Sequence, residues 1–213
     1  MKVAVIDYGM GNLHSVLKSV ESVNEIGAQI ELTRDPDAVR RADKVIFPGQ
    51  GAMRDCMREL RACGMAEAVL ESTREKPFLG ICVGAQLLFD RSEEGDTPGL
   101  GLFAGEVRRF ADGMHDAAGE RLKVPHMGWN RVFQTRAHPL FARIPDGERF
   151  YFVHSYYFAP QDDGLTLAES EYPARFSCIV GQGNVFATQF HTEKSHLAGL
   201  QMMKNFLAWD GTV

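Results

Sequence analysis

Residues 76–86 read Lys-Pro-Phe-Leu-Gly-Ile-Cys-Val-Gly-Ala-Gln, an apolar run that reaches a cysteine flanked by glycines. The first half of this run predicts a buried strand, and apolar residues at helical spacing follow Cys82 at once. A sharp strand-to-helix turn of this kind presents one reactive side chain at the rim of an α/β sheet. Gly80 and Gly84 suit such a turn because neighbouring backbone approaches it closely. The stretch therefore predicts a nucleophile elbow at Cys82.

Cys82 allows two interpretations. A free cysteine is among the most buried residue types and can serve as a small apolar side chain. A cysteine at a helix N-terminus can instead be a nucleophile, because the helix dipole favours the thiolate over the thiol. The flanking glycines and the downstream residues described below favour the nucleophile.

Composition narrows the class of protein. The 213 residues can bury a sizeable core, and we expect one domain over residues 1–213. The formal net charge of −5 argues against a general nucleic-acid-binding surface. The four cysteines lack the paired spacing of a zinc site or a disulfide framework, so we expect reduced thiols, no metal and no cofactor. The apolar run 3–6 is too short for a signal peptide or a membrane span, which predicts a cytoplasmic protein without membrane contact.

Strands and helices alternate in the first half of the chain, which predicts βαβ units around a parallel sheet. Strands are expected at 3–6, 29–32, 44–47 and leading into Cys82. Helices are expected from Asn12 to about Val23, through 53–60 and through 66–70, with a turn opening at Asp35-Pro36.

The second half predicts successive short strands and one final helix. The strands are expected at 106–110, 131–133, 150–153, 165–169, 176–180 and 185–190, with a hairpin turn at 181–184. The helix is expected over 194–209, with Leu197, Leu200, Met203, Phe206 and Leu207 facing inward. Surface loops are expected at 91–99 and 112–121. The predicted fold class is α/β, an open mixed, mostly parallel sheet flanked by helices.

A candidate general base follows the strand predicted at 185–190. A thiol that attacks a carbonyl needs a base to accept its proton, and the base needs an orienting partner. His191 and Glu193 are two residues apart, so on a strand they would point the same way. A lone histidine is usually structural, but here it accompanies a carboxylate and a cysteine elbow. Cys82, His191 and Glu193 are therefore predicted to form a Cys-His-Glu triad.

Acyl transfer also needs N–H donors aimed at the developing oxyanion. The glycine-rich segment Gly49-Gln50-Gly51 follows a predicted strand and can leave its N–H groups open. We expect an oxyanion hole formed by Gly49, Gln50 and Gly51 together with the N–H of Val83. Glycine's conformational freedom would allow a peptide flip in this loop to switch a donor into place.

Together these motifs resemble the class I (triad) glutamine amidotransferases over nearly the whole chain. Residues 48–51, 80–86 and 190–195 occur in the order typical of that family. Three further segments are similar to the glutaminase subunits of imidazole glycerol phosphate synthases, and they are residues 6–12, 123–130 and 151–157.

The resemblance implies hydrolysis of glutamine to glutamate, with the ammonia passed to a partner in histidine biosynthesis. In that family the partner is a (β/α)₈-barrel cyclase subunit, bound as a heterodimer. The enzyme would be a glutaminase that uses a Cys-His-Glu triad and a thioester intermediate.

The resemblance also implies roles for individual residues. Gln86 would contact the bound glutamine, and Gly51 with the backbone of His154, Ser155 and Tyr156 would hold its α-amino and α-carboxyl groups. The residues expected to face the partner are Asn12, Trp129 and Lys194. Lys194 could instead be a solvated cation at a helix end, and Trp129 could plug the edge of the core.

Two residues depart from the family pattern. Thr192 stands where family members usually have proline between the catalytic His and Glu, which could loosen the orientation of Glu193. Ala85 stands where a larger residue is common, which could widen the substrate pocket or change the packing.

Three other interpretations are open at this point. Gly9-Met10-Gly11-Asn12-Leu13-His14 is most of a dinucleotide-binding fingerprint, but His14 replaces its third glycine. The chain could serve another triad amidotransferase, of pyridoxal phosphate, anthranilate or guanylate synthesis, although residues 125–130 and 154–157 argue against this. It could also be a non-catalytic subunit that regulates a partner, which the intact triad argues against.

Overall fold

The structure, a computed structural model, describes all residues 1–213, and a parallel sheet lies at its centre. Its strands are β1 (Lys2–Ile6), β2 (Gln29–Thr33), β3 (Lys44–Gly49), β4 (Phe78–Cys82) and β13 (Val185–Thr188). They lie in the order β2-β1-β3-β4-β13, and each neighbouring pair is parallel. Every residue of β3, β4 and β13 is buried, as expected for strands covered on both faces.

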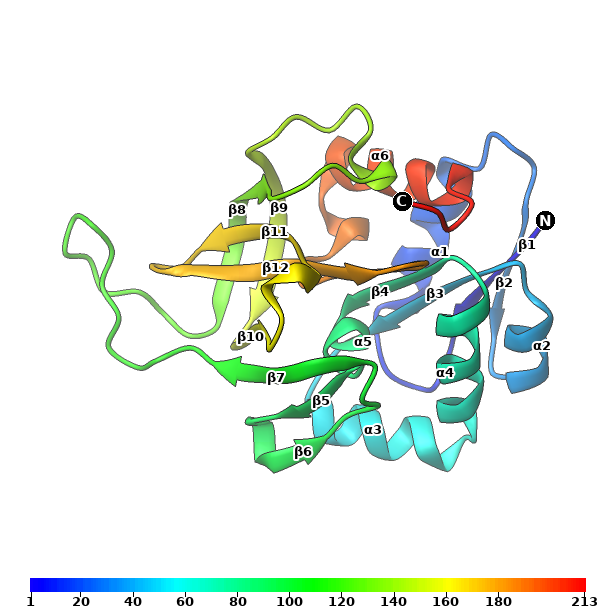
Figure 1. Cartoon of the computed structure of the whole chain (residues 1–213), viewed down its shortest axis with the longest axis horizontal. Helices are drawn as coiled ribbons and strands as arrows, with labels where there is room; N and C mark the ends of the chain where they lie inside the picture. The colour runs from blue at the N-terminus through cyan, green and yellow to red at the C-terminus, as the bar shows by residue number, and fades with distance from the viewer.

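Helices cover this sheet in two groups. They are α1 (Leu13–Ser22) with α6 (His196–Ala208), and α2 (Pro36–Arg41), α3 (Met53–Ala62) and α4 (Met65–Glu75). Helix α1 contacts α6, whereas α4 contacts both α2 and α3. Right-handed crossovers between parallel strands place the two groups on opposite faces of the sheet (Figure 1). No helix has both the length and the apolar character needed to cross a membrane.

Antiparallel strands extend the sheet beyond β13. In the main path these are β12 (Arg175–Gln182), β10 (Tyr156–Pro160), β7 (Phe103–Arg109), β5 (Phe89–Ser92) and β6 (Thr97–Pro98), with only β5 and β7 parallel to each other. A branch from β12 holds β11 (Thr166–Glu171), β8 (His126–Gln134) and β9 (Glu148–His154). The predicted mixed, mostly parallel fold class is confirmed. The predicted hairpin is the antiparallel β12–β13 pair.

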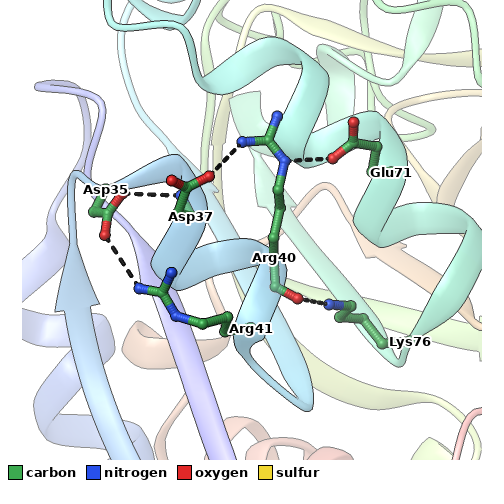
Figure 2. A network of polar contacts seen from close by, with 6 residues as sticks. All are labelled: Asp35, Asp37, Arg40, Arg41, Glu71 and Lys76. Carbon is green, nitrogen blue, oxygen red and sulfur yellow. Dashed lines mark hydrogen bonds and ion pairs between the residues drawn. The ribbon is translucent and has the colours of Figure 1, made fainter.

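Helix α2 corrects the turn predicted at Asp35-Pro36. The Asp35 carboxylate accepts a hydrogen bond from the Asp37 N–H at 2.9 Å, and proline occupies the first helical position. Both features start helices as readily as turns. Figure 2 shows that Arg40 then bridges Asp37 and, at 2.6 Å, Glu71 of α4. These ion pairs are half-exposed and contribute little free energy, so the apolar contact of Val39 holds the helix in place.

Other predicted boundaries also change. The helix after the elbow, α5 (Val83–Gln86), is a single turn, because the chain enters β5 soon afterwards. The predicted loop 91–99 contains the end of β5, a 3₁₀ turn η1 (Glu94–Asp96) and β6. Helix α6 begins after another 3₁₀ turn, η4 (Thr192–Lys194). Leu197 is 82% exposed, so its predicted inward position is wrong. Residues 112–121 do lie in a loop, which connects β7 to β8 (Figure 1).

A buried lysine joins β3 to the end of α6. The Lys44 ammonium donates hydrogen bonds to the carbonyl oxygens of Phe206 at 3.1 Å, of Leu207 at 2.7 Å and of Trp209. An ammonium has three donors, and the last carbonyls of a helix lack partners within the helix. Lys44 therefore acts as the C-terminal cap of α6 from a neighbouring strand.

The sheet order brings three strand ends to one edge. Gly49 at the end of β3 pairs with Cys82 at the end of β4, and Ile81 pairs with Thr188 at the end of β13. The segments that follow these strands therefore start side by side. In open α/β sheets, ligands bind outside the carboxyl ends of the strands.

Gly84 is predicted to be less tolerant of a side chain than Gly80. A Cβ atom on Gly84 would overlap the carbonyl oxygen of Phe47, whereas one on Gly80 would come no closer than 3.1 Å, to the Cα of Ala85. We expect Gly84→Ala to lower the free energy of unfolding by about 3 kcal/mol and Gly80→Ala by about 1 kcal/mol. Urea unfolding of both variants measures the difference, and equal losses would contradict the stated packing.

Candidate active site

Cys82 lies at the turn between β4 and α5 with a strained backbone. Its φ of 54° and ψ of −115° are unusual for a residue other than glycine. Such strain is typical of functional positions and is maintained by the structure around them. Because α5 has only four residues, its dipole offers less support for a thiolate than the sequence suggested. Other groups near Cys82 must supply it.

His191 is one such group. Its Nδ1 donates to Oε1 of Glu193 at 2.8 Å, and the two side chains are 5% and 1% exposed. This hydrogen bond leaves the other ring nitrogen for Cys82. Burial lowers the pKa of His191, but the Cys82 and Glu193 side chains more than offset it and raise the pKa well above its usual value. The site therefore favours an imidazolium beside the cysteine.

The pairing of His191 with Glu193 does not come from a strand. β13 ends at Thr188, before the predicted 190, and Glu193 lies in the 3₁₀ turn η4. The structure brings Cys82, His191 and Glu193 together, but by a turn and not by the alternation expected of a strand.

Two further residues support this segment and were not predicted. The Ser195 hydroxyl donates to the His191 carbonyl oxygen at 2.5 Å and accepts the Tyr151 N–H at 3.0 Å. The Gln189 amide nitrogen lies 3.9 Å from the sulfur of Cys82, and its oxygen accepts a hydrogen bond from Gln86 at 3.1 Å. Both lie in or next to the predicted segment 190–195, but only the fold gives them partners.

A cleft of about 330 Å³ opens over Cys82. Its lining includes most residues predicted to act on a substrate, namely Gln50, Gly51, Cys82, Val83, Gln86, His154, Ser155, Tyr156 and His191. Lys194, predicted at a partner interface, also lines it, together with Glu94, Pro125 and Val153, which were not predicted. A cleft of this size suits a small molecule.

The loop after β3 has open N–H groups. Neither Gln50 nor Gly51 donates its backbone N–H to a backbone acceptor. Gly51 has a φ of 102°, which only glycine adopts easily. Gly49 differs from the other two residues because it does not line the cleft and instead packs against the backbone of Gly84.

Glu94 is the carboxylate of the cleft that the sequence did not reveal. Its Oε2 accepts the N–H of Met53, the first residue of α3, at 2.7 Å. That bond fixes the side chain while its other oxygen is free. The residue was missed because residues 91–99 were interpreted as a surface loop.

Two hydrogen-bonded histidines, His126 and His154, are neutral and support the end of β9. The Tyr156 carbonyl oxygen can only accept, so His154 donates from Nδ1 at 2.7 Å. Its Nε2 must then accept from Nδ1 of His126 at 2.9 Å, and the Nε2 of His126 accepts from the Asn130 amide at 3.4 Å. Burial lowers the pKa of His126 to about 4 and that of His154 to about 3. Both rings therefore stay neutral.

Two of the predicted interface residues, Trp129 and Asn12, lie outside the cleft. Trp129 is 41% exposed and stacks on His196 at a ring distance of 5.0 Å, so it does not plug the core. Asn12 is half-buried at the start of α1 and makes no capping hydrogen bond with its side chain.

The two departures from the family pattern are both buried. Ala85 does not line the cleft, so its small size affects packing and not the substrate pocket. Thr192 is buried with no partner for its hydroxyl, and one carboxylate oxygen of Glu193 also lacks a partner. Glu193 nevertheless keeps its bond to His191.

Comparison with known proteins identifies relatives that belong to one family. Residues 4–209 match the family described as glutamine amidotransferase class-I. The chain is 78% identical over 213 residues to the imidazole glycerol phosphate synthase subunit HisH of Chromobacterium violaceum, with both chains fully covered. It is 65% identical to the protein of that name from Neisseria gonorrhoeae, covering 98% of this chain and 100% of the relative.

Solved structures share the fold. One is a putative GMP synthase subunit from Thermoplasma acidophilum, with a TM-score of 0.70, 20% identity, and coverage of 98% of this chain and 92% of that chain. Another, a glutamine amidotransferase, has a TM-score of 0.71 and 18% identity, with 97% of each chain covered.

Acid is predicted to lower the free energy of unfolding because His126 and His154 resist protonation in the folded state. In the unfolded chain these histidines bind protons below a pH of about 6.5, whereas folded His126 stays neutral down to a pKa of about 4. The unfolded state then binds more protons, so stability is complete above pH ~6.5 and falls as the pH falls towards 4. His126 alone contributes roughly 3 kcal/mol to that loss.

The pH dependence of urea unfolding between pH 7.5 and pH 4 checks this expectation. His126→Gln should be less stable at pH 7.5 but should lose less stability on acidification. His115→Gln, at an exposed histidine, controls for the removal of a histidine as such. An unchanged acid slope in His126→Gln would show that this ring is not the source.

Proposed function

The chain belongs to the class-I glutamine amidotransferases and to their HisH branch, and on this basis we propose that its cleft hydrolyses glutamine to glutamate and ammonia. Its place is that of the glutaminase subunit of imidazole glycerol phosphate synthase in histidine biosynthesis. The observation that carries this proposal is that Cys82 and His191 line one cleft, while the buried Glu193 binds His191 at 2.8 Å.

The first half of the reaction forms a thioester. The Cys82 thiolate attacks the side-chain amide carbon of glutamine, and a tetrahedral intermediate forms. The imidazolium of His191 gives its proton to the leaving nitrogen as the C–N bond breaks, and ammonia departs. Glu193 accepts the Nδ1 proton in a hydrogen bond, so the other ring nitrogen, Nε2, is the one that gives its proton.

The second half releases glutamate. His191, now neutral, takes a proton from water, and the oxygen of that water attacks the thioester carbon. The C–S bond breaks and Cys82 leaves as the thiolate, while His191 keeps the proton. In both halves the oxyanion is stabilised by N–H groups of the Gln50–Gly51 loop and of Val83.

Other lining residues bind the amino-acid end of the substrate. The free oxygen of Glu94 carries negative charge and suits the α-ammonium group of glutamine. The backbone at His154, Ser155 and Tyr156, with Gly51, would hold the α-carboxylate and complete the orientation. Gln86 contacts the side chain of the substrate from the elbow helix.

The ammonia is received by a (β/α)₈-barrel cyclase subunit, bound as a heterodimer in the cytoplasm. Asn12, Trp129 and Lys194 are assigned to that interface. Trp129 and Leu197 line the same surface hollow, and both are large apolar side chains exposed to water, as is Met127 two residues before Trp129. Residues 1–213 act as one amidotransferase domain, which one continuous cluster of 55 buried apolar residues supports.

Glutamate release is predicted to depend on the partner. We expect faint activity from the chain alone, little more with the cyclase, and a steep rise when the ribulosyl ligand of the cyclase is added. Enzymatic assay of glutamate in the three samples tests this. Strong activity of the chain alone would indicate a stand-alone amidohydrolase, and no activity in any sample would contradict the proposed function.

Replacement of the nucleophile is predicted to separate the two reactions. Cys82→Ala should abolish glutamine hydrolysis, because no thioester can form, while synthesis by the complex with added ammonia stays near the unmodified rate. Both rates are measured on the same preparation of the complex. Normal use of glutamine by the Cys82→Ala complex would show that Cys82 is not the nucleophile.

Glu94→Gln is predicted to weaken glutamine binding selectively. Glutamine at this position can still accept the Met53 N–H but lacks the charge for an α-ammonium group. KM for glutamine should rise at least about tenfold with little change in kcat, as expected for loss of a charge-assisted hydrogen bond. Glu93→Gln, at the neighbouring exposed carboxylate outside the cleft, is the control. A KM unchanged by Glu94→Gln would remove Glu94 from the binding site.

A further inference from the structure

Gln189 is a buried polar residue beside Cys82 that the proposed reaction does not use. It follows β13, and its backbone N–H donates to the Cys178 carbonyl oxygen of β12 at 2.8 Å, which fixes its place in the sheet. The residue is 0% exposed and does not line the cleft. A buried amide is costly unless its polar atoms find partners. The two ends of this amide contact Cys82 and Gln86.

The sulfur of Cys82 determines which way the Gln189 amide is turned. The Gln189 side-chain nitrogen lies 3.9 Å from that sulfur. A thiolate can only accept hydrogen bonds, and the sulfur of a thioester has no S–H group to donate. The N–H end of the Gln189 amide therefore faces Cys82 in both halves of the proposed reaction, and its oxygen faces Gln86.

The orientation of the Gln86 amide follows from that of Gln189. The Gln189 oxygen can only accept, so Gln86 turns its NH₂ group towards that oxygen, at a distance of 3.1 Å. The carbonyl oxygen of Gln86 is left without a donor from the protein, yet it is not sealed in the interior. Because Gln86 lines the cleft over Cys82, this oxygen opens to the cleft.

An oxygen in this position suits a substrate that brings N–H groups. Glutamine has N–H groups on its side-chain amide and on its α-ammonium group. If the Gln86 amide were turned the other way, its own N–H groups would meet those of glutamine, and neither could accept from the other. A polar group left unpaired in a closed site costs more than a formed hydrogen bond contributes. The orientation of the Gln86 amide therefore affects how tightly glutamine binds.

We propose that Gln189 is a positioning residue of the substrate site, which holds its amide N–H against the Cys82 sulfur and thereby turns the Gln86 oxygen towards an N–H group of the bound glutamine. This inference rests on the proposed function, because it concerns the same hydrolysis. It adds a residue behind the cleft that determines which end of the Gln86 amide the substrate meets.

The experiment measures kcat and KM for glutamine in the complex with the cyclase and its ribulosyl ligand. Gln189→Met keeps the length of the side chain but removes the amide, so Gln86 can present either end to the substrate. We expect KM to rise about fivefold, as for the loss of one hydrogen bond. Gln189→Leu should behave in the same way and serves if the methionine variant does not fold.

Gln189→Glu is the conservative variant. A carboxyl group at this position still presents an oxygen to the NH₂ group of Gln86, so KM should stay within about twofold of the unmodified value. The test is KM and not kcat, because every one of these variants changes the contact with the Cys82 sulfur.

A double variant tests whether Gln189 acts through Gln86. Gln86→Met removes the acceptor itself and should raise KM at least as much as Gln189→Met does. Once that acceptor is gone, Gln189 has nothing to orient. The double variant should therefore have the KM of Gln86→Met alone, within about twofold. A residue needed only for packing would add its own effect to that of Gln86→Met.

Gln134→Met is the matched control for loss of a glutamine amide. Gln134 is half-buried in β8 and donates a hydrogen bond from its side chain to the Ile144 carbonyl oxygen at 3.0 Å, but it lies outside the cleft. Its KM for glutamine should not change.

The outcomes separate the two proposals. If the unmodified complex hydrolyses no glutamine, the proposed function fails. If that complex is active while Gln189→Met and Gln189→Leu keep its KM, the role of Gln189 is wrong. Independent effects of Gln189→Met and Gln86→Met in the double variant, or a KM for Gln189→Glu as high as that for Gln189→Met, would likewise overturn it.

Discussion

The parallel pairing of β4 with β3 on one side and β13 on the other is the constraint on which the site depends. It places the ends of three strands, distant in sequence, at one edge of the sheet. Cys82 ends β4, the loop of Gln50 and Gly51 follows β3, and the His191 segment follows β13. Because the register pairs Gly49 with Cys82, a shift of one residue would separate the loop after β3 from Cys82. The close contact of Gly84 with the carbonyl of Phe47 holds the first two segments together.

The histidines in and near the site differ in charge because their surroundings differ. His191 has an acidic partner on each side and favours the charged ring. His126 and His154 have only neutral partners, and burial keeps them uncharged. The same side chain is thus charged beside Cys82 and is a neutral, hydrogen-bonded support behind the strand end at His154. Which role a histidine has depends on what its two ring nitrogens contact.

The sequence predicted what is encoded locally. The elbow at Cys82 and the first-half strands follow from short runs of residues, and the resemblance to class I glutamine amidotransferases is confirmed by the family match. Features that need a distant partner were missed. Glu94 is meaningful only beside the start of α3, and Ser195 only beside Tyr151. Leu197 fits the apolar pattern of a helix, but spacing alone does not reveal which face of the helix packs against the rest of the protein.

The Lys44 contact makes the last residues of the chain part of the fold. One ammonium holds carbonyl oxygens of Phe206, Leu207 and Trp209, so shortening the chain before Trp209 would leave a buried charge with too few acceptors. Val213, in contrast, is 75% exposed. An affinity tag attached to Val213 would therefore leave these contacts intact. Deletion of residues 209–213 would instead remove one of the acceptors of Lys44 and loosen α6 from β3. Because β3 leads into the loop of Gln50 and Gly51, a change at the end of α6 would also affect the cleft over Cys82.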